Sequence, residues 1–350
     1  MQGHNKDHDR LLIKFIIAAI MLCCVMAVSC CLGSSGITLS DVIRYFTGRS
    51  EELSRTTVTI LGRIRVPRTV TAALVGGALA TVGCVMQGLF RNAMADPSVL
   101  GISSGAALGA AVAIVTGLNG VIIWEAFTGA YIGAVIGAAV TWLMVFVIAS
   151  HNGRYDTSST LLAGIAISSL MSALITVLMT LHMEQMERVY LWMLGTFSAS
   201  TTGKTRLLLI VVAVLMPVVI FIAPRIDVLK LGREAAQTLG VNYKGTLLIA
   251  LGACSCLLAF CVANSGIIGF VGLIIPHIVS FFKVTRMRGR VIMSFMTGAV
   301  FMVLADTICK TIVAPGELAI GAVTSLIGAP YFLFLLIGSR IRSKKEKVSL

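Results

Sequence analysis

The 350-residue sequence has few charged side chains and no spacing of residues that suggests a metal site. Asp, Glu, Lys and Arg make up 12% of the chain, whereas soluble domains carry about 25%. This scarcity excludes an ordinary cytosolic enzyme. The nine cysteines lie in or beside apolar runs and form no C-x-x-C pair, so zinc and thiol-redox chemistry lack support. Hydrophobic residues make up 57% and recur in long runs, which indicates a polytopic membrane protein.

Apolar runs long enough for membrane helices recur along the whole chain. A bilayer core about 30 Å thick needs about 20 apolar residues per helix. On that scale the sequence predicts an all-α fold with about ten spans in one transmembrane domain, residues 1–350. The expected spans are 11–32, 66–89, 100–118, 126–149, 160–181, 206–223, 246–263, 266–283, 291–310 and 319–338. The first run is long for a signal peptide and lacks a cleavage-like site, which favours a retained anchor.

The net charge of +13 could indicate binding to nucleic acid, but the distribution of basic residues in a membrane protein explains it more simply. Lys and Arg accumulate in cytoplasmic loops, and placing both termini in the cytoplasm puts most of the 28 basic residues there. We therefore expect no nucleic-acid partner. An arginine cluster within residues 44–68 falls on the opposite side and breaks the rule locally. Arg65 and Arg68 either anchor a helix end at the headgroups or serve a function.

Groups for acid–base or ion-coupled chemistry are scarce inside the spans. Asp306 is the only acidic residue away from the span edges, and Lys310 follows four residues later, so the two could pair on one helix face. His277 stands alone and is expected to be a packing residue. Residues 203–205 resemble the end of a phosphate-binding loop, but Ser198 stands where its first glycine belongs. We expect no catalytic residue, metal, cofactor or nucleotide site, so any ATP-driven cycle must use a partner.

Four stretches are too polar or too rich in glycine to be only lipid-facing helix. The first is Arg65-Val66-Pro67-Arg68, and the second comprises Gln87–Pro97 and Gly101–Ala106. The third, Leu231–Val241, has a short helical core bracketed by glycines. In the fourth, Gly266–His277, three glycines at three-residue spacing are expected on nearly one helix face.

Together these stretches resemble the FecCD family, the permease subunits of bacterial ABC importers for iron–siderophore complexes, haem and corrinoids. The family patterns R-x-P-R, Q-G-x-x-R-N-P-L-A-D-P and G-x-S-S-G-A are similar to the first two stretches, and G-F-V-G-L-I-x-P-H is similar to the fourth. A further pattern, E-L-x-I-G-x-x-T-x-x-I-G-A-P, is similar to Glu317–Pro330. One departure is Ala93-Met94, where the family usually has Pro-Leu. The resemblance runs in order over nearly the whole chain and implies the ABC importer permease fold.

The resemblance also implies a function and partners. The chain would be a permease in the bacterial cell membrane that translocates a ferric siderophore, or haem or a corrinoid, into the cytoplasm. Its partners would be two copies of an ABC ATPase subunit, a periplasmic or lipid-anchored substrate-binding protein, a second permease copy or paralogue, and membrane lipid. We favour a homodimer.

The family's functional positions carry over to three sets of residues. Binding-protein docking would use Arg65, Arg68 and Lys310. ATPase coupling would use the segment 231–241, whose matching residues are Leu231, Gly232, Glu234, Ala235, Leu239 and Gly240. A cytoplasmic gate would use Thr157 and Ser158. The alternative for these two residues is a helix N-cap, for which both are well suited. The alternative for the coupling segment is an ordinary cytoplasmic loop.

A competing interpretation is an ion-coupled secondary transporter whose glycine-interrupted spans form broken helices around a midplane site. It needs ligands for a coupling ion, and the expected spans contain only Asp306 and hydroxyl groups as candidates. A purely structural membrane subunit would leave the arginine cluster unexplained.

Overall fold

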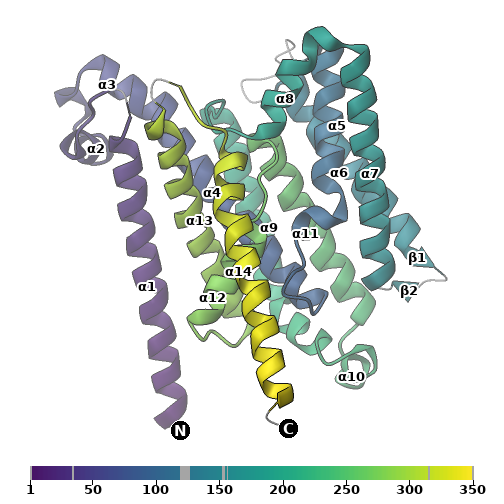
Figure 1. The fold of residues 1–350 in the computed structure, drawn as a ribbon. Coiled ribbons are helices and arrows are strands. Elements are labelled where there is room, and N and C mark those ends of the chain that lie inside the picture. Colours follow the sequence, from purple (N-terminus) through teal and green to yellow (C-terminus); the bar gives the residue numbers. More distant parts are fainter. Residues whose placement is uncertain are drawn as a thin grey trace.

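The computed structural model describes residues 2–33, 35–118, 127–151, 154–155, 157–313 and 316–348, which form a bundle of helices (Figure 1). The longer helices are α1 (Gln2–Cys31), α4 (Val66–Leu89), α6 (Gly129–Ala149), α7 (Thr157–Leu181), α9 (Thr202–Leu229), α11 (Tyr243–Ser265), α13 (Met287–Ile312) and α14 (Ile320–Val348). The shorter ones are α2 (Leu39–Phe46), α3 (Arg55–Ile60), α5 (Ile102–Val115), α8 (Met186–Leu194), α10 (Arg233–Thr238) and α12 (Val271–Phe281).

Smaller elements join these helices. Single 3₁₀ turns form η1 (Ser50–Glu52), η3 (Pro97–Leu100) and η5 (Met183–Gln185), and a π-helical turn, η2 (Leu61–Arg65), leads from α3 into α4. The short strands β1 (Ser150–His151) and β2 (Arg154–Tyr155) pair antiparallel just before α7.

Each of the ten expected spans contains a helix in the described part of the chain. Seven helices there are long and apolar enough to cross a membrane, and three shorter apolar helices cover Ile102–Val115, Val271–Phe281 and Ile320–Leu335. The all-α membrane fold is confirmed. That the three shorter helices also cross the membrane stays a prediction.

The expected helix at 266–283 is shorter than the sequence indicates. Gly266 has a left-handed φ of 71° where α11 ends, and Phe270 has a φ of 67° just before α12 begins. A Cβ on Gly266 would lie 2.3 Å from the carbonyl oxygen of Trp192. Glycine is therefore needed here for close approach as well as for its conformation. Only Gly272 of the three spaced glycines is helical, so the prediction that they share a helix face is wrong.

Helix α4 is the centre of the bundle, with 94% of its most apolar window buried. Small residues bring its neighbours close, because a Cβ on Gly76 would lie 2.3 Å from the carbonyl oxygen of Gly298 in α13. A Cβ on Gly83 would likewise clash with the backbone of Gly272 in α12. Such close backbone approach is how membrane helices gain packing energy without a hydrophobic driving force.

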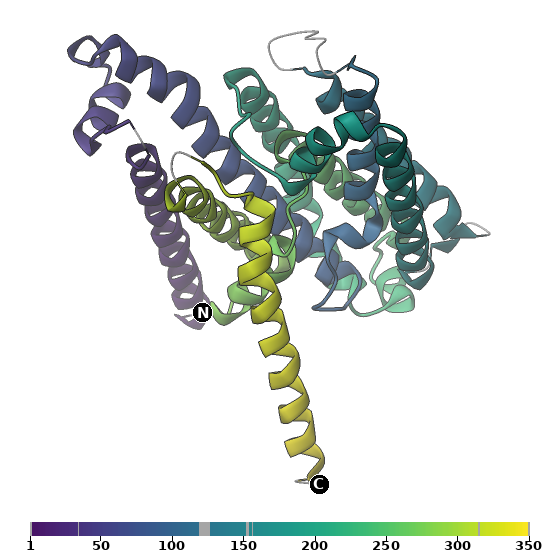
Figure 2. The same ribbon diagram turned by 45° about the horizontal axis from the view of Figure 1, so that its top comes forward.

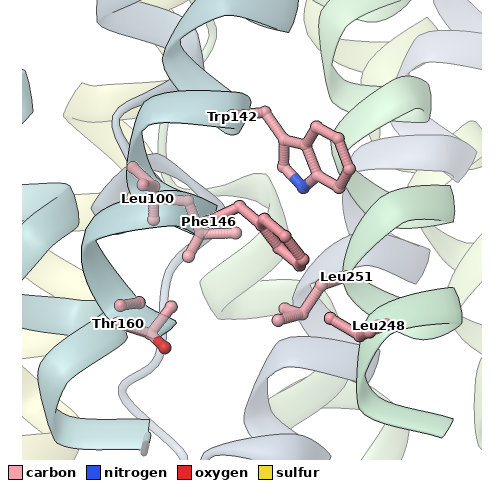
Figure 3. A pocket seen from close by; sticks show the side chains of 8 residues that line it. Leu100, Trp142, Phe146, Thr160, Leu248 and Leu251 are labelled. Carbon is pink, nitrogen blue, oxygen red and sulfur yellow. The ribbon is translucent and has the colours of Figure 1, made fainter. Parts of the chain in front are cut away.

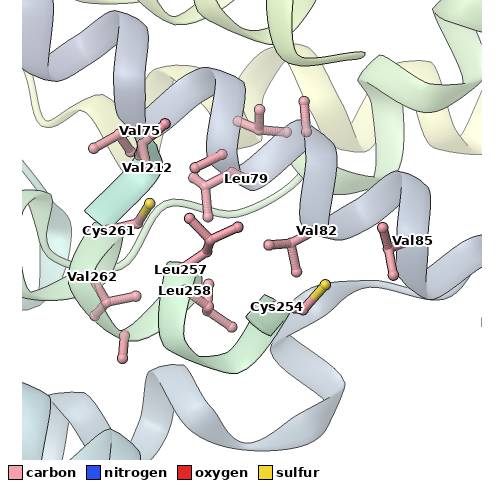
Figure 4. Close-up of a cluster of buried hydrophobic side chains, with 14 of the residues drawn as sticks. Val75, Leu79, Val82, Val85, Val212, Cys254, Leu257, Leu258, Cys261 and Val262 are labelled. Carbon is pink, nitrogen blue, oxygen red and sulfur yellow. The ribbon is translucent and has the colours of Figure 1, made fainter. Parts of the chain in front are cut away.

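A third side of α4 faces α9 and α11 through larger apolar side chains. Figure 4 shows Leu79 and Val82 of α4 against Leu257 of α11, with Val212 of α9 at the edge of the cluster. These four side chains are at most 4% exposed. Close packing on every side of α4 fixes the relative positions of the helix ends, where the candidate functional residues lie.

The two ends of the bundle differ in what they carry. Both chain termini and the short helix α10 lie at one end, and α2 and α3 lie at the other (Figure 1). Helix α14 projects past the other helices at the terminal end (Figure 2). Below, the end with the termini is called the terminal end, and the end with α2 and α3 is called the opposite end.

Candidate functional site

The three basic residues expected to dock a partner all lie at the opposite end, where α1 ends, α4 begins and α13 ends. Arg65 is only 7% exposed. Its guanidinium donates to the carbonyl oxygens of Cys30 and Cys31, the second at 2.8 Å, and to the Ser35 hydroxyl. The last carbonyls of a helix lack partners within it and carry partial negative charge. Arg65 therefore caps the C-terminus of α1.

Arg68 is held by two carboxylates. Its Nε and Nη2 donate to both oxygens of Asp306 at 2.8 to 3.1 Å, and its Nη1 donates to Oε1 of Glu317 at 2.5 Å. Asp306 is 1% exposed, whereas the Glu317 side chain is 34% exposed. The fork of the guanidinium matches both oxygens of one carboxylate. This buried ion pair joins α4 to α13.

Lys310 does not pair with Asp306, so that expectation from the sequence is wrong. Its Nζ donates to the carbonyl oxygen of Ser29 at 2.6 Å and to the Ser29 hydroxyl at 3.0 Å. The reason lies in the packing of helices that are distant in the sequence. Arg68 occupies both oxygens of Asp306, and the open carbonyls at the end of α1 lie within reach of the lysine.

The resulting cluster of Arg65, Arg68, Lys310, Asp306 and Glu317 is short of negative charge. Both carboxylates are ion-paired with Arg68, while the hydrogen bonds of Arg65 and Lys310 go to uncharged oxygens. Buried cations without a full counter-charge are costly and raise the local positive potential. The opposite end thus favours the approach of acidic groups.

At the terminal end, the segment 231–241 folds as the sequence predicts. Helix α10 is bracketed by Gly232 and Gly240, which have left-handed φ angles of 110° and 75°. Leu231 and Leu239 are 64% and 60% exposed, while Ala236 between them is fully buried. Glu234 and Ala235 lie in the first turn of the helix. Two large apolar side chains thus stand out from an anchored short helix.

Asp227, a residue that sequence reasoning missed, ties the end of α9, which precedes this segment, to α13. Its Oδ2 accepts the backbone N–H of Met287 at 2.8 Å, and its Oδ1 accepts from Lys230 Nζ at 2.7 Å. A carboxylate at a helix N-terminus is stabilising. Here the carboxylate comes from the last turn of α9, immediately before Leu231. Since α13 carries Asp306 and Lys310 near its other end, one helix links both candidate regions.

The gate candidates Thr157 and Ser158 begin α7, and their side chains lie outside the described residues. A pocket close to them is lined mainly by apolar side chains (Figure 3). Trp142 and Phe146 of α6 face Leu251 of α11 across it, and Thr160 of α7 contributes a hydroxyl. The side chains that line this pocket carry no charge.

Helix α7 exposes a line of hydroxyl residues that sequence reasoning also missed. Ser169, Ser172, Thr176 and Thr180 are all exposed, and their spacing puts them along one face of the helix. The hydroxyls of Ser169, Thr176 and Thr180 donate back to carbonyls of α7 itself. The signal in the sequence was this spacing of polar residues within an otherwise apolar run.

Within the part of the chain that the structure describes, no three His, Cys, Asp or Glu side chains gather in a way that could hold a metal ion. The ring of His277 packs edge to face against Phe281, with 5.5 Å between the ring centroids. It packs similarly against Tyr331 at 6.2 Å. These contacts agree with a packing role for His277.

Comparison with known proteins identifies the class. Residues 19–338 match the FecCD transport family, so the chain belongs to that family of transport permeases. The cobalamin import system permease protein BtuC of Halobacterium salinarum is 39% identical over 284 residues, covering 81% of this chain and 75% of the relative. The hemin transport system permease protein HmuU of Yersinia pestis is 37% identical over 281 residues, covering 79% and 83%.

A solved structure supports the same fold. A metal-chelate type ABC transporter in an inward-facing conformation superposes with a TM-score of 0.80 at 26% sequence identity. The match covers 93% of this chain and 99% of that one. The chain is a permease of an ABC importer for substrates of the iron-chelate, haem or vitamin B12 type.

Proposed function

We propose that this permease brings a ferric siderophore, or a metal complex of similar size, into a bacterial cytoplasm. The similar proteins named for cobalamin, hemin and metal chelates all handle large metal complexes, which supports this substrate class. The pocket beside the start of α7 is lined by uncharged side chains, so the proposal leaves recognition of the complex to the partner that delivers it.

The proposed orientation puts the terminal end, with both termini and α10, in the cytoplasm. The segment 231–241 then seats in a groove of a separate ABC ATPase subunit. The observation that carries this proposal is the pair of exposed leucines on an anchored short helix. Apolar anchors in a partner's pocket supply most of the energy of such an interface. Helix α10 follows directly on α9, whose Asp227 accepts from the first residue of α13. In this proposal a displacement of α10 therefore passes through the end of α9 into α13 as a rigid-body motion.

The opposite end is the proposed docking surface for the substrate-binding protein. The surplus of positive charge around Arg65, Arg68 and Lys310 supports an acidic partner surface. Because all three side chains also hold the ends of α1, α4 and α13 together, docking and the arrangement of these helices are coupled. Charges of this kind mainly set the rate and the register of association.

A second permease copy completes the proposed pathway, with the hydroxyl line of α7 facing it. Exposed hydroxyls on a membrane helix fit a water-filled path or a partner helix better than lipid. Thr157 and Ser158 at the cytoplasmic start of the same helix are the proposed gate.

Replacing Leu231 and Leu239 with glutamate tests the coupling proposal. We expect the variant to insert and purify normally but to lose co-purification with the ATPase subunit and the transport-linked ATP hydrolysis. Leu118, which is 53% exposed and lies outside the segment 231–241, is the matched control, and Leu118→Glu should keep the co-purification with the ATPase subunit. Retained association of the ATPase with the double variant would refute the coupling role.

The substrate is tested with the reconstituted complex of permease, ATPase and binding protein. Uptake of radiolabelled ferric siderophores, haem and cobalamin into vesicles is compared at equal concentration. We expect the ferric chelate to accumulate fastest. Preferential uptake of haem or cobalamin would overturn the substrate assignment and leave the ABC mechanism standing.

A further inference from the structure

Helix α2 displays an apolar stripe that no other described part of the chain covers. Leu39, Ile43 and Phe46 are 51%, 54% and 64% exposed. Their spacing of four and three residues puts them on one face of the helix. Leaving three large apolar side chains in water would forfeit the free energy gained by burying them.

The helix is preformed and firmly attached. Thr38 and Asp41 form a capping box, in which Thr38 Oγ1 bonds the Asp41 carboxylate at 2.7 Å and the two backbone N–H groups find side-chain acceptors. On the adjoining side, Val42 is 3% exposed and packs with Ile37 and Leu61. The exposed stripe is therefore held in a fixed direction.

The capping box also keeps its form over a wide range of pH. The hydrogen bonds from Thr38 hold the pKa of Asp41 below its ordinary value. The carboxylate therefore stays ionised, and its contribution to the cap is lost only when the pH falls through that lowered pKa.

An open groove borders the stripe and shares Ile43 with it. It is lined by Ser40, Ile43, Arg44, Thr47 and Arg49. Arg44 also forms an exposed ion pair with Glu52, whose Oε2 lies 3.6 Å from Arg44 Nε. Two arginines and two hydroxyl residues at the border of an apolar face match the chemistry of a phosphate group.

The occupant is indicated by continuity with α1. The membrane span Leu11–Cys31 packs against α13 along one side, and none of its most apolar window is buried, so its other side is open to lipid. Its exposed apolar surface continues through Val28 and Leu32 to the place where α2 begins. Figure 1 shows α2 beside this end of α1, at the periphery of the bundle.

We propose that α2 lies in the membrane interface, with Leu39, Ile43 and Phe46 among the acyl chains and the Arg44–Arg49 groove around a phospholipid phosphate. An amphipathic helix in this position sits about 5–10 Å into the boundary between headgroups and acyl chains. It fixes the depth of α1 and the tilt of the π-helical turn that carries Arg65. The proposal does not depend on the substrate or on the ATPase.

The test uses light-activated cross-linking in the full chain. Benzoylphenylalanine replaces Phe46 in one variant and Glu51 in another, since Glu51 is exposed and lies outside the stripe. After irradiation in vesicles of phosphatidylethanolamine and phosphatidylglycerol, mass spectrometry identifies the adducts. We expect phospholipid adducts at position 46, several-fold above those at position 51.

Other outcomes overturn the proposal. An adduct with a protein partner at position 46, or an equal lipid yield at both positions, would mean that the stripe serves a different contact. Because Phe46 is 64% exposed, replacing it leaves the core intact, and a single gel-filtration peak checks this.

The phosphate part is tested separately. The pair Arg44→Glu and Arg49→Glu should lower the lipid adducts at position 46 in phosphatidylglycerol vesicles, whereas Arg55→Glu, an exposed arginine outside the groove, should not. An unchanged yield in the double variant would remove the groove from the proposal.

Discussion

At the scale of single residues, the charged side chains at the opposite end bond to other parts of the chain as well as giving this end its positive charge. Sequence reasoning found Arg65, Arg68, Lys310 and Asp306, but it could not assign their partners. The partner of Arg68 lies 238 residues away in the chain, and that of Lys310 lies 281 residues away. A spacing of four residues made Asp306 and Lys310 look like a pair, and only the packing of α4 and α1 against α13 decides otherwise.

Replacing Asp306 with alanine should destabilise the protein strongly. The change leaves the buried Arg68 guanidinium with only Glu317, and breaking a buried ion pair costs about 3–5 kcal/mol. Thermal unfolding in detergent measures the effect. Glu317→Gln is the control, because that side chain is 34% exposed and its pair with Arg68 is only partly buried, so a smaller loss is expected than for Asp306. Equal shifts in Tm for both variants would contradict the buried role of Asp306.

At the scale of elements, hydropathy located a helix in every expected span, because length and apolar content are what a bilayer requires. Hydropathy did not predict the structure where the chain breaks a helix or forms a short helix outside the spans. The break at 266–270 depends on left-handed residues, and α2 and α3 are too short and too polar for a window tuned to membrane helices. The cap of α13 by Asp227 depends on contact between two helices, which no local pattern contains.

The close approach of α4 and α13 can be tested at one glycine. Gly76→Ala would put a methyl group 2.3 Å from the Gly298 carbonyl oxygen and from Met302 Cβ, and overpacking of this kind costs about 1–3 kcal/mol. Gly252→Ala in α11 is the matched control. Its nearest neighbour would be Trp142 at 3.8 Å, so a gain of about 0.5–1 kcal/mol is expected from the better helix former.

Both variants are measured by thermal unfolding in the same detergent. The Tm should fall for Gly76→Ala and should hold or rise for Gly252→Ala. A stable Gly76→Ala protein would mean that α4 and α13 pack less closely than described here.

At the scale of the whole molecule, the sequence was enough to identify the fold class and the family, because ordered motifs span nearly the entire chain. It could not show that α13 reaches from one candidate region to the other, or that the end of α9, which leads into α10, is bonded to α13. Those features arise from contacts between distant segments. The hydroxyl line on α7 was visible in the sequence, but its exposure was not.

If the ATPase subunit supplies the energy and the permease supplies only the pathway, the behaviour of the isolated permease can be predicted. Purified permease alone in liposomes should accumulate no ferric chelate against a gradient, with or without a sodium or proton gradient. Adding the ATPase, the binding protein and ATP should start accumulation. Uphill uptake by the permease alone, driven by an ion gradient, would favour the secondary transporter instead.

The pairing of Arg68 with Asp306 also sets an order of events during biosynthesis. The ribosome delivers α4 to the membrane long before α13 exists, so the guanidinium must wait for its counter-ion. Until then the guanidinium, on the third residue of α4, has to stay among the headgroups, since a lone guanidinium in hydrocarbon is costly. Completion of the bundle therefore depends on the last part of the nascent chain, which supplies Asp306 and Glu317, both carboxylate partners of Arg68.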